Sequence, residues 1–227
     1  MFHRMEVAMF VRGGFMSTLV LILLTGCGEV SDPSMGSFYA DDAKTHQVEA
    51  DRFALVNGTP DAVGVLAFVN DEATDLHRLD VDAKLDRRAA RGIIHHRNGP
   101  DGVYGTWDDE LFETIEALDA VKWVGGRAIG RLVEYSNTYG WVPSVTDHLG
   151  NYDGVDFTVL EADITLALIN ESSLEALDEF LNRRAAISLF ENAPFASIYE
   201  VAHARYVGRA AMKSLKRTAV QAVQIQK

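Results

Sequence analysis

The spacing of apolar residues predicts helices along most of the chain after residue 60. Between Glu72 and Leu79 an apolar residue falls at every third position, and the segment after Asp86 carries apolar residues along one helical face. Asp86 and Thr114 are suited to cap helices, and Gly125-Gly126 interrupts the pattern before another helix begins. The pattern predicts further helices near 61–69, 158–169, 172–179, 182–191, 197–203 and 209–223.

Several short blocks of sequence occur twice in the same order, which indicates an internal duplication. The matched pairs are Leu66–Asp71 with Leu166–Glu171, Leu85–Ala90 with Leu181–Ala186, Phe112–Ile115 with Phe195–Ile198, and Val124-Gly125 with Val207-Gly208. Helices rich in alanine and leucine resemble one another by composition, but composition alone does not repeat such landmarks in order. We therefore expect an all-α fold of two tandem units, repeat 1 (51–136) and repeat 2 (158–227), joined by a linker (137–157) rich in turn-forming residues.

The N-terminal segment has the features of a bacterial secretion signal. Two arginines, Arg4 and Arg12, precede the apolar run Leu19–Leu24, which is too short to span a bilayer as a helix. The following Leu24-Thr25-Gly26-Cys27 resembles the lipobox of lipoproteins and contains the only cysteine of the chain. We expect a signal peptide (1–26), acylation of Cys27 and a flexible tether (27–50), with anchoring at the outer membrane; the alternative is an ordinary signal peptide with an incidental cysteine.

Charge is distributed unevenly along the chain. The formal net charge of -12 argues against a general nucleic-acid coat protein. From Val201 to Lys227, however, there are six lysines and arginines and no acidic residue. Helical spacing places four of these cations on one face, which predicts a phosphate-tracking surface or, alternatively, only a solvated helix. These four are Arg209, Lys213, Lys216 and Arg217.

The duplicated unit resembles the paired helix-hairpin-helix fold, and more closely the competence DNA-receptor family. The residues that carry the resemblance are Val69–Ala73, Arg88–Ile94, Phe112–Ile115 and Val121–Gly125 in repeat 1, and Ile169–Ser173 and Arg205–Gly208 in repeat 2. The resemblance implies binding of double-stranded DNA through its backbone, without strong sequence preference. In this interpretation the backbone amides of Gly125, Gly126 and Gly208 contact phosphates, and Arg127, Arg209, Lys213 and Arg217 add positive charge beside them.

The hairpins depart from the family pattern in ways that weaken this interpretation. The first hairpin of repeat 1 (81–85) has no glycine and carries Asp82, and the first hairpin of repeat 2 (178–181) is short and acidic. The second hairpins (121–125 and 205–208) keep one glycine of the usual two, with Trp123 and Tyr206 near the other position. These departures favour a second hypothesis, in which the chain is a scaffold lipoprotein that binds an envelope protein and no DNA.

Other candidate chemistry is sparse. The insertion Gly99–Glu110 is rich in acids and glycines and could wrap calcium, but its spacing is not that of an EF-hand, and a solvated loop is the simpler interpretation. His95 and His96 are adjacent, so on a helix they point apart and form a poor metal pair. The sequence contains no metalloprotease, serine-hydrolase or phosphate-loop motif. We therefore expect no enzyme, no cofactor, no metal and no small-molecule substrate.

Overall fold

The structure is a computed structural model that describes residues 55–225. The expected signal peptide, the acylated Cys27 and the tether lie outside the described residues. In the part of the chain that is described, no helix is both long and apolar enough to cross a membrane.

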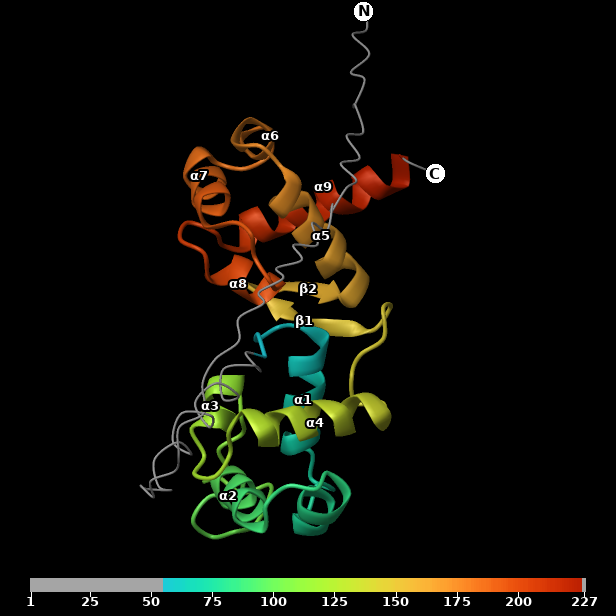
Figure 1. Ribbon diagram of the computed structural model, residues 1–227. Helices are drawn as coiled ribbons and strands as arrows, with labels where there is room; N and C mark the ends of the chain where they lie inside the picture. The colour runs from blue at the N-terminus through green and yellow to red at the C-terminus, as the bar shows by residue number, and fades with distance from the viewer. Residues whose placement is uncertain (1–54, 226–227) are drawn as a thin grey trace, which may run out of the picture. The chain divides into compact units, whose positions relative to one another are not determined.

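Repeat 1 consists of helices around a core of its own. Its first helix follows Thr59, whose hydroxyl caps it, and Pro60 occupies the first turn. This helix packs against the last helix of the repeat (Figure 1). The elements are α1 (Pro60–Asn70), the π-helix η1 (Arg78–Asp82), α2 (Arg87–Arg97), α3 (Ile115–Asp119) and α4 (Gly126–Thr138). The fully buried side chains include Phe68, Leu79, Ile93, Leu118 and Leu132.

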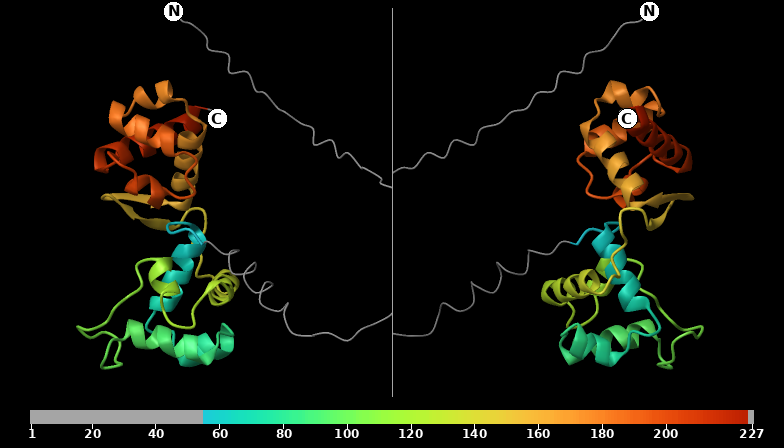
Figure 2. Two further views of the ribbon diagram at one scale, coloured as in Figure 1. Left: turned by 60° about the vertical axis from the view of Figure 1, so that its left-hand side comes forward. Right: turned by 90° about the vertical axis from the view of Figure 1, so that its right-hand side faces the viewer.

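Repeat 2 follows the same helical order after a pair of strands. The elements are β1 (His148–Tyr152), β2 (Val155–Thr158), α5 (Val159–Glu171), α6 (Leu174–Asp178), α7 (Arg183–Asn192), α8 (Ile198–His203) and α9 (Arg209–Ile225). Thr158 and Glu161 form a capping box that starts α5, and α5 packs along α9 (Figure 2). The fully buried side chains include Phe157, Ile169, Leu177, Met212 and Leu215.

The same hydrogen-bonded contact occurs in both repeats. The side-chain amide of Asn70 accepts from the backbone N–H of Phe112 at 2.9 Å and donates to its carbonyl at 2.8 Å. Asn170 makes the same two bonds with Phe195, at 2.9 and 3.0 Å. We call this pair of bonds the Asn–Phe contact. It joins the blocks that the sequence comparison paired, so the matched residues occupy equivalent places in the two repeats.

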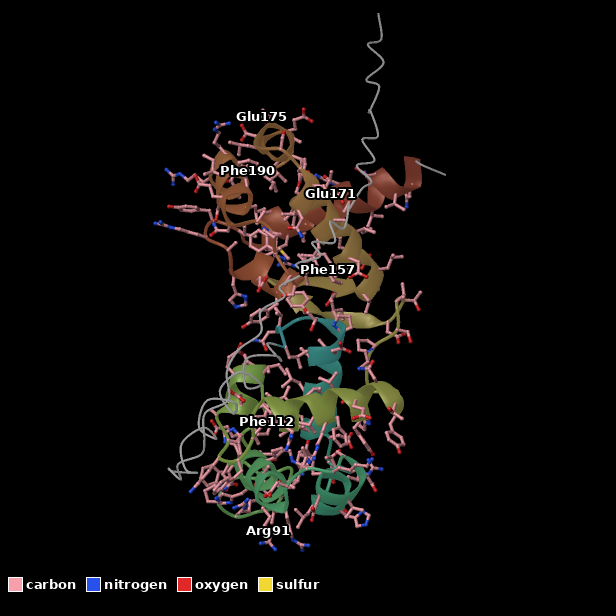
Figure 3. All side chains as sticks on the ribbon, viewed as in Figure 1. Arg91, Phe112, Phe157, Glu171, Glu175 and Phe190 are labelled. Atoms are coloured by element: carbon pink, nitrogen blue, oxygen red, sulfur yellow. The ribbon has the colours of Figure 1, made fainter. Side chains whose placement is uncertain are left out.

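The all-α prediction is wrong in one segment, and the chain is mostly helical with a small sheet. Residues 137–157, expected to be a linker, contain the end of α4 and most of an antiparallel β-hairpin in which Tyr152 pairs with Val155. The side chains of Tyr152, Val155 and Phe157 belong to the core of repeat 2 (Figure 3 labels Phe157). The turn residues Asp153 and Gly154 both have positive φ, as a tight hairpin turn requires. Their turn-forming character suggested a linker, but it closes a hairpin.

The predicted helix over Glu72–Leu79 is also wrong in its start and its type. Residues 72 and 73 form a turn, residues 76 and 77 are helical as predicted, and the π-helix follows, in which the Ala83 N–H donates to the Arg78 carbonyl at 2.8 Å. The Asp71 carboxylate accepts from the Ala73 N–H at 2.9 Å, and the Asp75 carboxylate accepts from the Arg78 N–H at 2.9 Å. Such local side-chain bonds compete with a regular helix, which the apolar spacing alone could not show.

Candidate nucleic-acid interface

Each second hairpin ends in the same three-residue arrangement. An aromatic residue with positive φ comes first, at +74° for Trp123 and +67° for Tyr206. A valine that packs into the core follows, and then a glycine, Gly125 or Gly208. Because the valine is fixed in the core, the aromatic residue and the glycine are held at the surface in both repeats.

The helices that begin at these glycines have open N-terminal ends. Gly125 provides no side-chain cap for α4, and the first helical bonds run from the Ile129 N–H to the Gly125 carbonyl and from the Met212 N–H to the Gly208 carbonyl, both at 3.0 Å. The amides of the three residues between have no helical carbonyl to bond. A Cβ added at either glycine would meet no described atom within 4 Å. Both helix starts are therefore accessible to an anion.

The first hairpins differ, because their helix starts are closed by their own side chains. The Asp86 carboxylate accepts from the Arg88 N–H at 2.8 Å, and the Asn182 side chain accepts from the Ala185 N–H at 3.0 Å. Hydrogen bonds from the Arg88 side chain and amide hold the pKa of Asp86 below its ordinary value, so Asp86 stays ionised. A carboxylate or carboxamide thus occupies the place that an external anion would take.

Equivalent contacts hold the two hairpins of each repeat together. In repeat 1 the Arg131 guanidinium donates to the Lys84 carbonyl of the first hairpin. In repeat 2 the Ser214 hydroxyl, on the equivalent turn of α9, donates to the Phe180 carbonyl at 2.8 Å. Because these bonds join the first hairpin to the helix after the second, the closed and open helix starts of each repeat lie near one another.

The four cations expected on one face of α9 fall into two groups. Lys216 is not available to a ligand, because its ammonium pairs with the Glu161 carboxylate at 2.8 Å and donates to the Asp156 carbonyl at 2.7 Å. Arg209 also turns toward the β-hairpin, where its guanidinium lies over Gly154. Lys213 and Arg217 remain exposed and line a groove with the first hairpin, at Phe180, Leu181 and Asn182. The spacing of these residues correctly predicted that they lie on one helix. It could not show that a carboxylate and a carbonyl from other elements would pair with Lys216.

The second hairpin of repeat 1 has a less favourable charge environment. Arg127 is exposed on the first turn of α4, but Gly125 and Gly126 line a pocket that also contains Glu116 and Asp119. These two carboxylates repel an anion. In repeat 2 the equivalent positions, 83 residues later, are Tyr199 and Ala202, which carry no charge. The open helix start at Gly208 is therefore the better anion site of the two.

A set of exposed side chains surrounds the two hairpins of repeat 2, and we call it the hairpin face of repeat 2. Its cations come from α7, from the second hairpin and from α9, and none forms an ion pair with any residue that the structure describes. Of the acids in the first hairpin, Asp178 is neutralised by Arg183 at 2.6 Å, while Glu179 is exposed. The face consists of Arg184, Arg205, Lys213 and Arg217.

The acidic insertion uses its carboxylates internally. Asp108 accepts from the Asp101 N–H at 3.2 Å and from the Thr106 hydroxyl at 2.6 Å, and Asp109 accepts from the Gly105 N–H at 2.6 Å. Over residues 55–225, no three histidine, cysteine, aspartate or glutamate side chains are placed to hold a metal ion. His95 is exposed, whereas His96 stacks on Phe112 with ring centroids 4.6 Å apart.

Sequence reasoning missed a buried arginine in repeat 1. Arg97 is 2% exposed, and its guanidinium donates to the carbonyls of Val69, Asp71 and Thr74 at 2.7 to 3.1 Å. Burial lowers the pKa of Arg97, while Tyr104, Asp109 and Asp71 oppose this effect. Its role is to close the end of α1, and no spacing in the sequence distinguishes it from the exposed arginines nearby.

The arrangement can bind a phosphate-like group through unpaired helix amides and the unpaired cations of the hairpin face of repeat 2. Comparison with protein-family models, with curated proteins and with solved structures gives no match to this chain.

Proposed function

We propose that this chain is a lipid-anchored, non-catalytic helix-hairpin-helix protein of the bacterial cell envelope that binds the backbone of double-stranded DNA without sequence preference. The observation that carries this proposal is the difference between the hairpins. Asp86 and Asn182 close the helix starts of the first hairpins, whereas Gly125 and Gly208 leave those of the second hairpins open. Contacts to phosphates carry no base information, so the expected binding is general.

Repeat 2 is the stronger binding site in this proposal. The unpaired cations Arg184, Arg205, Lys213 and Arg217 lie on its hairpin face, and Gly208 has no acidic neighbours equivalent to Glu116 and Asp119. A local positive surface can hold DNA on a chain whose net charge is negative, because salt screens charges beyond about 10 Å. Repeat 1 would contribute more weakly, through Gly125 and Arg127.

The anchor rests on the sequence alone. The order Arg4, Arg12, apolar run and Cys27 supports export and acylation, and a tether of residues 27–50 would hold the repeats away from the membrane. Two or three acyl chains on one cysteine give firm attachment.

The test is a titration of the full-length chain, purified in nonionic detergent, with a fluorescent duplex of random sequence at several salt concentrations. We expect the logarithm of the affinity to fall linearly with the logarithm of salt, by about 0.9 for each phosphate contact. Lys213→Glu and Arg217→Glu, each as a single variant, should flatten that slope. Arg91→Glu is the control with the same change of net charge, because Arg91 points outward from α2 (Figure 3) and lies outside both second hairpins.

A chain that does not bind duplex at low salt would refute this proposal and favour the scaffold hypothesis. One observation supports that second function directly. Trp107 is 95% exposed on the acidic insertion, which also carries the exposed Val103 and is followed by the exposed Leu111. Exposed aromatic residues are common anchors in protein interfaces. A pull-down from envelope membranes that captures a partner with the wild-type chain, but not with Trp107→Ala, would establish it.

A further inference from the structure

Two exposed aromatic residues occupy a backbone conformation that normally favours glycine. Trp123 and Tyr206 have positive φ, and their residues are 53% and 49% exposed. A side chain with a Cβ is disfavoured in this left-handed region, and bulky residues are rare there. Strained residues that persist in a fold commonly mark a functional position. The two aromatic residues are 83 positions apart and occupy matching places in the two repeats, so an aromatic residue with positive φ occurs at the same place in both.

Cations from matching positions of the two repeats lie over each aromatic ring. In repeat 1 the Arg88 guanidinium lies 4.1 Å from the Trp123 ring centroid, and the Lys122 ammonium lies 5.3 Å from it. In repeat 2 the guanidinium groups of Arg205 and Arg184 lie over the Tyr206 ring, at 4.7 Å and 5.8 Å from its centroid. Arg88 matches Arg184, and Lys122 matches Arg205, in the duplicated sequence. Each second hairpin therefore presents a half-exposed aromatic ring with two positive charges over it.

From this arrangement we propose that Trp123 and Tyr206 stack on unpaired nucleobases, so that the chain prefers single-stranded nucleic acid to an intact duplex. The inference rests on the proposed function and specifies the form of its ligand. Surfaces that bind single strands combine cations along the backbone with aromatic rings for the bases. Duplex DNA offers its phosphates at the surface but keeps its base faces stacked inside.

The distance between ring and helix start suits one strand. Each aromatic residue precedes its glycine by two positions, and two residues span at most about 7 Å. A phosphate at the open amides after Gly208 and a base on Tyr206 can therefore belong to the same nucleotide or to neighbours. A peptide ligand with an aromatic side chain would use the ring but would leave the cations without a regular anionic partner.

The test compares a thymidine oligonucleotide with a blunt duplex of the same length, using the full-length chain in detergent. We expect tighter binding of the oligonucleotide, and a loss of roughly 5- to 100-fold in its affinity for Trp123→Gly with Tyr206→Gly. Glycine fits the positive φ, so these variants should melt at the wild-type temperature or above and should keep their duplex affinity. Trp123→Tyr with Tyr206→Trp should restore oligonucleotide binding.

Two further measurements separate stacking from general charge. With Trp107→Phe and Trp141→Phe, Trp123 is the only tryptophan left, and its fluorescence should be quenched by the oligonucleotide more than by the duplex. Trp107→Ala is the control for an exposed aromatic outside the hairpins, and it should leave oligonucleotide affinity unchanged.

The outcomes distinguish the two proposals. If the glycine variants lose affinity for both ligands equally, or for neither, base stacking is wrong while duplex binding by the wild-type chain still supports the proposed function. If the wild-type chain binds neither ligand, both proposals are overturned.

Discussion

Replacing Gly208 with aspartate should strengthen the fold and weaken nucleic-acid binding at the same time. Gly208 is the residue before α9, its φ lies outside the left-handed region, and an added Cβ would meet no described atom within 4 Å. An aspartate there can accept from the open amides of α9, as Asp86 does at the start of α2. The variant would therefore convert an open helix start into a closed one.

The two effects have magnitudes that can be worked out separately. Aspartate in place of glycine at an N-cap is worth a few tenths of a kcal/mol, and its charge near the helix start adds about 0.3 to 1 kcal/mol. For a domain of this size, about 1 kcal/mol raises the melting temperature by roughly 2 to 4 °C. Against a bound phosphate, a carboxylate about 4 Å away costs roughly 1 kcal/mol in water and up to about 4 kcal/mol near a protein surface. Together with the loss of the amides, we expect affinity to fall at least about tenfold.

The assay measures both quantities on the same preparations. Thermal unfolding and salt-dependent duplex binding are recorded for wild type, Gly208→Asp and Gly208→Ala. Alanine fills the same space but caps poorly, so Gly208→Ala should be slightly less stable than wild type and should bind nearly as well. In Gly208→Asp stability rises while affinity falls, a pattern that partial unfolding cannot produce, and Gly208→Ala shows whether added bulk alone has either effect.

The reasoning would be refuted if Gly208→Asp bound duplex as tightly as wild type with the same salt dependence. That result would mean that the amides of α9 contact no phosphate, even if other cations bind DNA.

Three other predictions concern the fold and the anchor. Arg97→Met leaves three carbonyls of a buried region without their donor and should reduce the free energy of unfolding in urea by about 3 kcal/mol or more, whereas Arg91→Met should change it by less than about 0.5 kcal/mol. Burial alone would raise the pKa of Glu161, but hydrogen bonds from the Lys216 ammonium and the Thr158 amide lower it by more than burial raises it. The folded-state pKa of Glu161 therefore lies below the ordinary value. The stabilisation from the ionised Glu161 is present above the ordinary glutamate pKa, about 4.3, and is lost as the pH falls through the lowered value. Glu161→Gln should therefore be less stable than wild type by about 1 to 3 kcal/mol at neutral pH. A stability difference that did not shrink in acid would contradict this. Cys27→Ser should abolish incorporation of radiolabelled palmitate and release the chain from membranes, and continued labelling would rule out Cys27 as the acylated residue.

The helical part of the fold was predictable because its signals are local. Caps such as Thr114 and Asp86 stand next to apolar spacing of the right period, and the structure places helix starts at both. The duplication was visible as well, because residues such as Asn70 and Phe112 are fixed by a contact that both repeats need. The β-hairpin escaped prediction because its strands are short and its turn residues also suit a linker.

The candidate site was predictable only in part, because its decisive features depend on contacts across the fold. The glycines and the helical position of the cations follow from the sequence. Whether a cation is paired does not follow from the sequence, because Lys216 is paired by Glu161 of α5 and the Asp156 carbonyl of β2, whereas Lys213 is exposed. Positive φ at Trp123 and Tyr206 could have been suspected, because each stands where the hairpin pattern has glycine.

The Asn–Phe contact has a consequence for how this chain tolerates change in length. In repeat 2 only residues 193–194 separate the end of α7 from Phe195, whereas in repeat 1 the whole segment 98–111 separates α2 from Phe112. Asn70 and Asn170 nevertheless fix the chain in the same way after both segments. The connection before this point can lengthen without displacing the helices behind it, which makes it a natural place to graft foreign sequence.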